Sequence, residues 1–299
     1  MQPKQNPFSI YDFLGYFLPG SLALLVILAI SHIWFPEFSV FEFLSKHCEL
    51  TRSESYFLFI VLAYTTGHIF SFISSLTIER YSIWRYDYPS KYLLSFKYKG
   101  YFNVEDEPIY ARKILRAIFG FLILLPISYP EYVIGRVLNM RDLYAKRLDP
   151  LLEKLIWGKI RGLMYERSEV KDLNATGKPS DQDFFRFVYH FVLENAPAHQ
   201  PKMQNYIALY GFLRTLTFLS VLTFWLIFAS CFGEKLDVVY SVCLLTSTAF
   251  VGLILFLGFV KFYRRFSLEV LMALSVTFNS KKKVSIKKNT VRQKLSSKH

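Results

Sequence analysis

The sequence predicts an all-α integral membrane protein with four transmembrane helices and a helical cytosolic domain inserted between the second helix and the third. Two observations lead to this prediction. Hydrophobic residues make up 53% of the 299 residues and the mean hydropathy is +0.26, which is more apolar than an ordinary soluble domain. The formal charge is nevertheless +13. Such a composition excludes a disordered chain, and three cysteines are too few for a disulfide scaffold.

Four apolar stretches are long enough to cross a bilayer, because a helical span takes about 20 mostly apolar residues. In chain order they are about 13–35, 56–76, 211–232 and 236–260. The first two contain no Asp, Glu, Lys or Arg. The first is also too long for a secretory signal and lacks its cleavage site. We therefore expect two transmembrane hairpins, in residues 1–77 and 208–262.

A fifth apolar run, AIFGFLILLPIS at residues 117–128, is too short for an ordinary span. A full crossing there would also place the basic stretches 79–116 and 136–161 on opposite sides of the membrane, which argues against it. Three interpretations stay open. The run is a re-entrant segment, an interfacial segment, or a core helix of the cytosolic domain.

Basic residues give the expected orientation, because short loops rich in Lys and Arg stay in the cytoplasm. Residues 261–299 carry eleven Lys and Arg against one Glu, whereas the loop 36–55 carries two Lys and Arg against four Glu. Four spans then place both termini in the cytoplasm. Residues 78–207 become a cytosolic domain, and residues 263–299 become a basic cytosolic tail.

The inserted segment is itself expected to be mainly helical. Leucine and isoleucine recur near helical spacing through 136–172. Pro150 follows Asp149, a good N-cap residue, at the expected start of a helix. A further helix beginning near Pro201 is expected to enter the third span without a break, which would link the domain mechanically to the membrane.

The sequence contains none of the short motifs that are typical of nucleotide binding, zinc proteases, serine hydrolases or paired-cysteine sites. Cys48 falls in an expected outer loop, and Cys231 and Cys243 fall in or near the last two spans. We therefore expect no catalytic residue, no cofactor and no metal ion.

Polar residues recur on one face of the second span. Tyr64, His68, Ser71 and Ser75 follow each other at steps of four, three and four residues, which places them on the same side of a helix. Polar groups within a membrane face protein or a water-filled cavity. The face is therefore either a pore lining with a titratable histidine or a packing face that joins helices through hydrogen bonds.

Arg214 lies near the expected cytoplasmic end of the third span. A long basic side chain at this position can extend its charged end into the head-group region. We therefore interpret Arg214 as an anchor of membrane depth.

The C-terminal tail contains a dense basic run that suits a negatively charged membrane surface. The expected contacts of anionic lipid head groups are Lys281, Lys282, Lys283, Lys287 and Lys288. Lipid is favoured over nucleic acid as the partner of these charges, because the tail directly follows a span.

Three stretches are notable as a set: YDFLGYFLPG in the first span, PKMQNYIALYGFLRTLTFLSVL in the third, and FVKFYRRFSLEVL after the fourth. Together they resemble uncharacterised bacterial multi-pass membrane proteins, some of which are encoded beside phage-defence genes. The resemblance implies a bacterial inner-membrane effector or sensor that works with cytosolic protein partners. It implies no catalytic residues.

These observations predict a membrane effector or scaffold. Its cytosolic domain would sense a signal or a partner, and its oligomerised spans would permeabilise or remodel the membrane, as in defence against phage. Four spans are few for a solitary transporter, so a pore would form between subunits. The alternatives are a constitutive channel or transporter component, with His68 on its pathway, and a membrane-bound enzyme.

Overall fold

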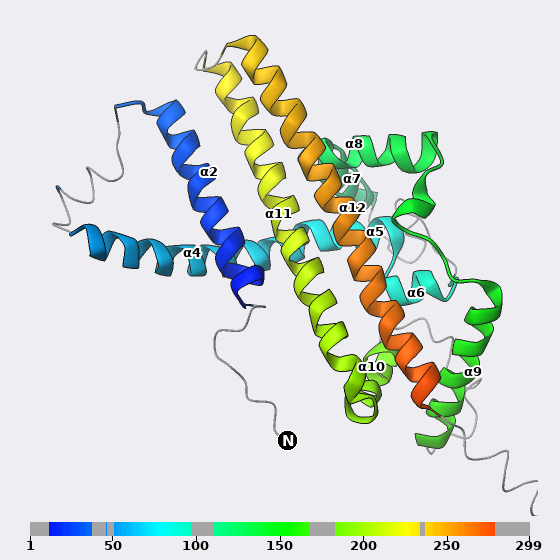
Figure 1. Ribbon diagram of the computed structural model, residues 1–299. Coiled ribbons are helices and arrows are strands. Elements are labelled where there is room, and N and C mark those ends of the chain that lie inside the picture. Colours follow the sequence, from blue (N-terminus) through cyan, green and yellow to red (C-terminus); the bar gives the residue numbers. More distant parts are fainter. Residues whose placement is uncertain are drawn as a thin grey trace, which may run out of the picture. The chain divides into compact units, whose positions relative to one another are not determined.

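The structure is a computed structural model that describes residues 12–37, 46, 51–96, 110–167, 183–233 and 237–278 (Figure 1). Within these residues every regular element is a helix. Four helical stretches are long and apolar enough to span a membrane, which confirms the prediction of a helical chain with four such helices. They are Phe13–Trp34, Ser53–Leu93, Pro197–Phe232 and Val238–Thr277.

The chain divides into two compact units. The first unit comprises Met1–Asp87, Lys97–Lys146 and Gln204–Arg265. The second comprises Tyr88–Phe96, Arg147–Met203 and Phe266–His299. The predicted cytosolic segment 78–207 is therefore shared between the units, because the described residues 110–146 belong to the first of them.

In the first unit, α11 (Gln200–Phe232) and α12 (Val238–Thr277) form an antiparallel hairpin. Contacts run from Tyr206 with Phe262 and Tyr210 with Phe259 to Leu213 beside Gly258 and Ser220 beside Gly252. Residue numbers rise on one helix as they fall on the other, so the two helices run antiparallel. The α11 helix also begins well before the third apolar stretch and enters it without a break, as the sequence predicts.

The N-terminal helix runs alongside α11. It begins as the π-helix η1 (Phe13–Phe17) and continues as α2 (Leu18–Trp34). At its far end, the Trp34 indole Nε1 donates a hydrogen bond of 2.7 Å to Ser230 Oγ, near the end of α11. This bond satisfies the polar end of an otherwise apolar side chain.

Helix α4 (Arg52–Ser74) begins with a complete capping box, in which Thr51 and Glu54 satisfy each other's backbone amides. It then crosses the first helix with almost no space between the two backbones. A Cβ atom on Gly20 would lie 1.8 Å from the carbonyl oxygen of Ala63, and one on Gly67 would lie 1.9 Å from the carbonyl oxygen of Tyr16. Only glycine permits this close approach, as in other small-residue contacts between membrane helices.

The rest of the first unit continues from α4. The π-helix η2 (Ser75–Glu79) leads into α5 (Arg80–Tyr86). A later stretch of the chain also belongs to this unit. Its elements are α7 (Tyr110–Ile118), the π-helix η3 (Phe119–Ile123), α8 (Leu125–Tyr132), the π-helix η4 (Val133–Val137) and the 3-10 helix η5 (Arg141–Leu143). Three π-helical turns therefore interrupt these helices, and such turns are frequent at functional sites.

The second unit is a small helical bundle. Its elements are α6 (Pro89–Leu93), α9 (Pro150–Arg167), α10 (Asp183–Asn195), η6 (Pro197–His199) and the last turns of α12. Fully buried apolar side chains form its core, among them Ile160, Val188 and Leu271. Their burial is the main source of stability for such a bundle.

The end of α12 differs from the predicted tail, which begins at residue 263. The helix continues to Thr277, and Val270, Leu271 and Leu274 are fully buried in the second unit. In the same unit, the Glu269 carboxylate lies 2.9 Å from His199 Nδ1 and forms an ion pair with Lys202 Nζ at 2.6 Å. The reason is that this stretch has an apolar helical face of its own, which hydropathy averaged over the tail does not reveal. The five tail lysines 281–283, 287 and 288 lie outside the described residues.

Candidate functional site

Arg214 on α11 is the centre of a polar cluster in the first unit. Its guanidinium forms an ion pair with Glu79 of η2. Its Nε donates to Ser74 Oγ at 3.2 Å, and its Nη2 donates to the Ser71 carbonyl at 3.3 Å. Tyr263 of α12 donates to the other Glu79 oxygen at 3.3 Å. One charged pair therefore joins three apolar helices.

The arginine is largely enclosed, with 13% of its side chain exposed. Taking such charges out of water is unfavourable unless each group is paired and hydrogen-bonded. Glu79 and the serines of α4 supply those partners. The arrangement is thus a polar connection within apolar surroundings, and losing either charge would leave the other poorly compensated.

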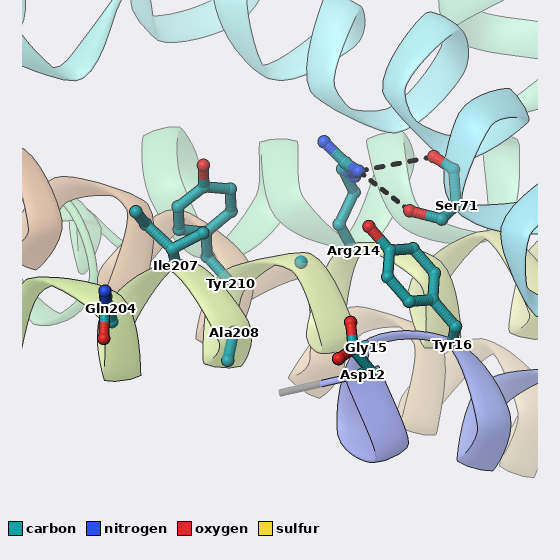
Figure 2. Close-up of a pocket in the computed structure, with 10 residues that line it drawn as sticks. Asp12, Gly15, Tyr16, Ser71, Gln204, Ile207, Ala208, Tyr210 and Arg214 are labelled. Carbon is teal, nitrogen blue, oxygen red and sulfur yellow. Dashed lines mark hydrogen bonds between the residues drawn. The ribbon is translucent and has the colours of Figure 1, made fainter. Parts of the chain in front are cut away.

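Beside this cluster lies an open cavity of about 370 Å³ (Figure 2). Arg214 and Ser71 form part of its wall, and Tyr16 and Asp12 reach it from the start of the first helix. Gln204 and other residues of the first turns of α11 complete it. Carboxylate, guanidinium, hydroxyl and amide groups thus meet around one space among helices that are otherwise apolar.

The predicted polar face of α4 is partly assembled at this place. The rings of Tyr16 and His68 stack with centroids 3.8 Å apart, and Tyr64 meets His68 edge-on at 4.6 Å. Ser71 bonds Arg214, but the Ser75 hydroxyl donates to its own helix, at the carbonyl of Phe72.

The neighbour Ser74, and not Ser75, contacts Arg214 and lies 3.4 Å from the hydroxyl of Thr215. Ser74 and Ser75 lie three and four residues after Ser71, so both lie near the same face of an α-helix and helical spacing does not decide which of them meets Arg214. His68 itself is exposed at the surface of the chain.

Glu79 is not among the residues that the sequence predicts for this site, although it is the partner of Arg214. A local signal existed, because Glu79 is the first acidic residue after the second apolar stretch and Arg214 is the first basic residue in the third. Two opposite charges at corresponding ends of neighbouring spans are candidates for an ion pair.

A second polar cluster surrounds Glu131, whose side chain is 1% exposed. Its carboxylate accepts hydrogen bonds from Arg85 Nε at 3.0 Å, from Tyr144 OH at 3.1 Å and from Tyr86 OH. The Arg141 guanidinium lies over the Tyr86 ring, 4.8 Å from its centroid. A buried carboxylate with this many donors holds α5, α8 and the turn at Tyr144 together.

Tyr144 gives this cluster a measurable pH dependence. Burial, with the nearby charge of Glu131, raises the pKa of the Tyr144 phenol from 10.0 to about 12. The phenol therefore stabilises the fold fully below pH 10, and this stabilisation is lost as the pH rises through 12. In thermal unfolding of detergent-solubilised protein, we expect the wild type to lose stability more steeply above pH 10 than Tyr144→Phe.

The same variant should be less stable at neutral pH by about 1–3 kcal/mol, because a hydrogen bond to a charged group is lost. Parallel pH profiles for the wild type and Tyr144→Phe would show that Tyr144 is not the titrating group.

No set of three His, Cys, Asp or Glu residues within the described ranges is arranged to hold a metal ion. No family model, no curated protein and no solved structure matches the chain.

Proposed function

We propose that this chain is a multi-pass membrane effector, whose spans permeabilise or remodel the membrane when the helical part outside them receives a signal or a partner. The observation that carries the proposal is the Arg214–Glu79 pair with its open polar cavity, set among helices that are long and apolar enough to span. Ionisable groups within spans are rare, and they mark pathways or switching contacts.

The geometry favours a gated activity over a constitutive one. Ser71, Ser74 and Glu79 all belong to the α4–η2 stretch, and all bind the one guanidinium on α11. Breaking a part-buried, hydrogen-bonded pair of this kind is worth about 2–3 kcal/mol, which is enough to shift an equilibrium between two helix arrangements by roughly thirtyfold or more. The pair is therefore suited to hold one arrangement closed.

Exposed groups on the apolar helices support an oligomeric effector. Phe57 on α4 and Phe250 on α12 are 70% and 62% exposed, as expected for side chains that face lipid or another copy. His68, a polar group in the middle of α4, is also exposed. A polar group at membrane depth requires protein or water beside it, and a second copy of the chain would provide either.

A flux assay with the full chain tests this proposal. The protein is reconstituted into phosphatidylethanolamine–phosphatidylglycerol vesicles with a potassium gradient, and a potential-sensitive dye follows leakage. We expect wild-type vesicles to stay sealed and Arg214→Gln to raise leakage at least tenfold, because the part-buried ion pair is lost. Arg265→Gln, an exposed arginine on α12, is the matched control and should stay sealed.

Two outcomes would count against the gated effector. Equal leakage from wild-type and Arg214→Gln vesicles would favour the constitutive channel. If vesicles with folded Arg214→Gln protein stay sealed, the ion pair stabilises the structure but does not keep a pathway closed. In cells, the same dye during phage challenge, with and without the neighbouring genes, tests the proposed role in defence.

A further inference from the structure

We infer that residues 110–137 form a re-entrant segment, which dips into the hydrocarbon core of the membrane and returns to the side from which it entered. The inference rests on the proposed membrane insertion of α11 and α12. It assigns lipid acyl chains as the partner of the exposed face of this segment.

The depth of the segment follows from its contact with α11. The Ile123 carbonyl oxygen accepts a hydrogen bond of 2.8 Å from the Trp225 indole Nε1. Trp225 lies eleven residues beyond Arg214, which is about 16 Å along an α-helix. The hydrocarbon core of a bilayer is about 30 Å thick. If Arg214 lies near one boundary of that core, Ile123 lies near its middle.

Contact with α12 gives a similar depth independently. The position that a Cβ on Gly252 would occupy is 3.8 Å from Ile127 and 3.2 Å from Ser220. Gly252 lies nine residues before Lys261, the next basic residue on that helix, which is about 13 Å of helical rise. Both spans therefore place the same turn well inside the membrane.

The backbone of the turn is built for a place without water. Leu124 leaves the helical conformation, with φ −98° and ψ 14°, and is 1% exposed. Its carbonyl accepts from the amides of Ile127 and Ser128 at 2.9 and 2.7 Å, and Pro126 has no amide hydrogen to donate. The Ile123 carbonyl thereby loses its usual helical donor, and Trp225 supplies one.

This arrangement meets the condition for irregular backbone at membrane depth, which is tolerated where protein buries and satisfies it. A turn on a solvated surface has no comparable need of an indole donor, because water serves the same carbonyl.

The outer face of the segment is strongly apolar. Its exposed large apolar side chains are Ile114, Leu115, Ile118, Leu122, Ile123, Leu125, Tyr129, Tyr132 and Val137, each between 38% and 66% exposed. So many exposed apolar side chains on one short segment are unusual on a protein domain in water. Lipid acyl chains can cover this face directly, because the turn already lies beside the two spans.

The charges on either side of the apolar run 117–128 within this segment agree with a return to the same side. Arg112, Lys113 and Arg116 precede the apolar run, and Arg136 and Arg141 follow it. Basic residues at both ends of the apolar run place both ends on the cytoplasmic side of the membrane. The run of a dozen residues that is too short to cross the bilayer is long enough to enter it and leave.

Cysteine accessibility in the full chain tests this inference. In a background with the three native cysteines replaced by serine, single variants Leu122→Cys and Ile118→Cys are placed in phosphatidylethanolamine–phosphatidylglycerol vesicles and exposed to a charged maleimide. Leu151→Cys on α9 is the control for water, and Phe250→Cys on α12 is the control for lipid; both parent side chains are more than half exposed.

We expect Leu122→Cys and Ile118→Cys to react about tenfold or more slowly than Leu151→Cys, because hydrocarbon excludes the charged probe and disfavours the thiolate. A bimane label at residue 122 should be quenched more by a nitroxide deep in the acyl chains than by a shallow one. Cysteines at Ala111 and Leu138 should both react from the same face of the vesicle.

Several results would overturn the inference, and each has its own meaning. Labelling of Leu122→Cys as fast as Leu151→Cys would place the segment in water. Stronger quenching by the shallow nitroxide would make it interfacial, and loss of protection at low protein density would make the cover a second copy. Labelling of residues 111 and 138 from opposite faces would make the segment a full span. Fast labelling of Phe250→Cys would instead refute membrane insertion of α12, and with it the proposed function.

Discussion

Replacing Gly20 with alanine is expected to lower the free energy of unfolding of the first unit by about 3 kcal/mol or more, as overpacking against an unyielding neighbour does. The added Cβ would lie 1.8 Å from the Ala63 carbonyl oxygen and 2.6 Å from the Gly67 amide nitrogen. Both are backbone atoms within α4, so no side chain can rotate away. The two helices would have to separate along their whole crossing.

Thermal unfolding in detergent, followed by circular dichroism, measures this effect. Gly15→Ala is the matched control, because its added Cβ would meet nothing within 4 Å. The control should be neutral or slightly stabilised, since alanine favours helix over glycine by about 1 kcal/mol. If Gly20→Ala were as stable as Gly15→Ala, the first helix and α4 would not cross at this glycine.

Replacing Arg214 with methionine is expected to lower the free energy of unfolding by about 2–3 kcal/mol. Methionine resembles the aliphatic stem of arginine but carries no charge, so Glu79 would keep the donor Tyr263 in place of a cation. The penalty is mainly that of the unpaired carboxylate, and it should therefore be relieved when that carboxylate is removed as well.

A double-mutant cycle with Glu79→Gln separates this effect from lost packing. We expect the double variant Glu79→Gln/Arg214→Met to be more stable than Arg214→Met alone, with a coupling energy of about 1–3 kcal/mol. Arg214→Lys retains the charge without the planar fork, so it should fall between the wild type and Arg214→Met. Purely additive effects would show that the two side chains do not interact in the folded protein.

Local signals in the sequence are enough to predict the helices. Long apolar stretches and the proline at Pro150 are such signals, and they correspond to helices at the expected places. The prediction reached less far at two places. Helical spacing did not separate Ser74, which meets Arg214, from Ser75, and the buried face of residues 266–277 continues α12 beyond the expected end of the span.

Part of the candidate site was also visible in the sequence. Arg214, His68 and Ser71 stand out because charged and polar groups are rare in apolar stretches. Their partners do not stand out in this way. Asp12 and Tyr16 reach the cavity from the first helix, far away in the sequence from α11.

Which distant groups meet depends on how the helices pack. Glu79 and Arg214 are separated by 135 residues, and Ile123 and Trp225 by 102. Hydropathy and helical period report how one segment meets its surroundings, whether lipid, water or protein. They carry no information on which segment provides the partner, because many polar groups could satisfy a given charge or carbonyl. Packing selects the partner. The glycines at the helix crossing allow two backbones to touch, and the buried turn at Leu124 fits against one particular part of α11.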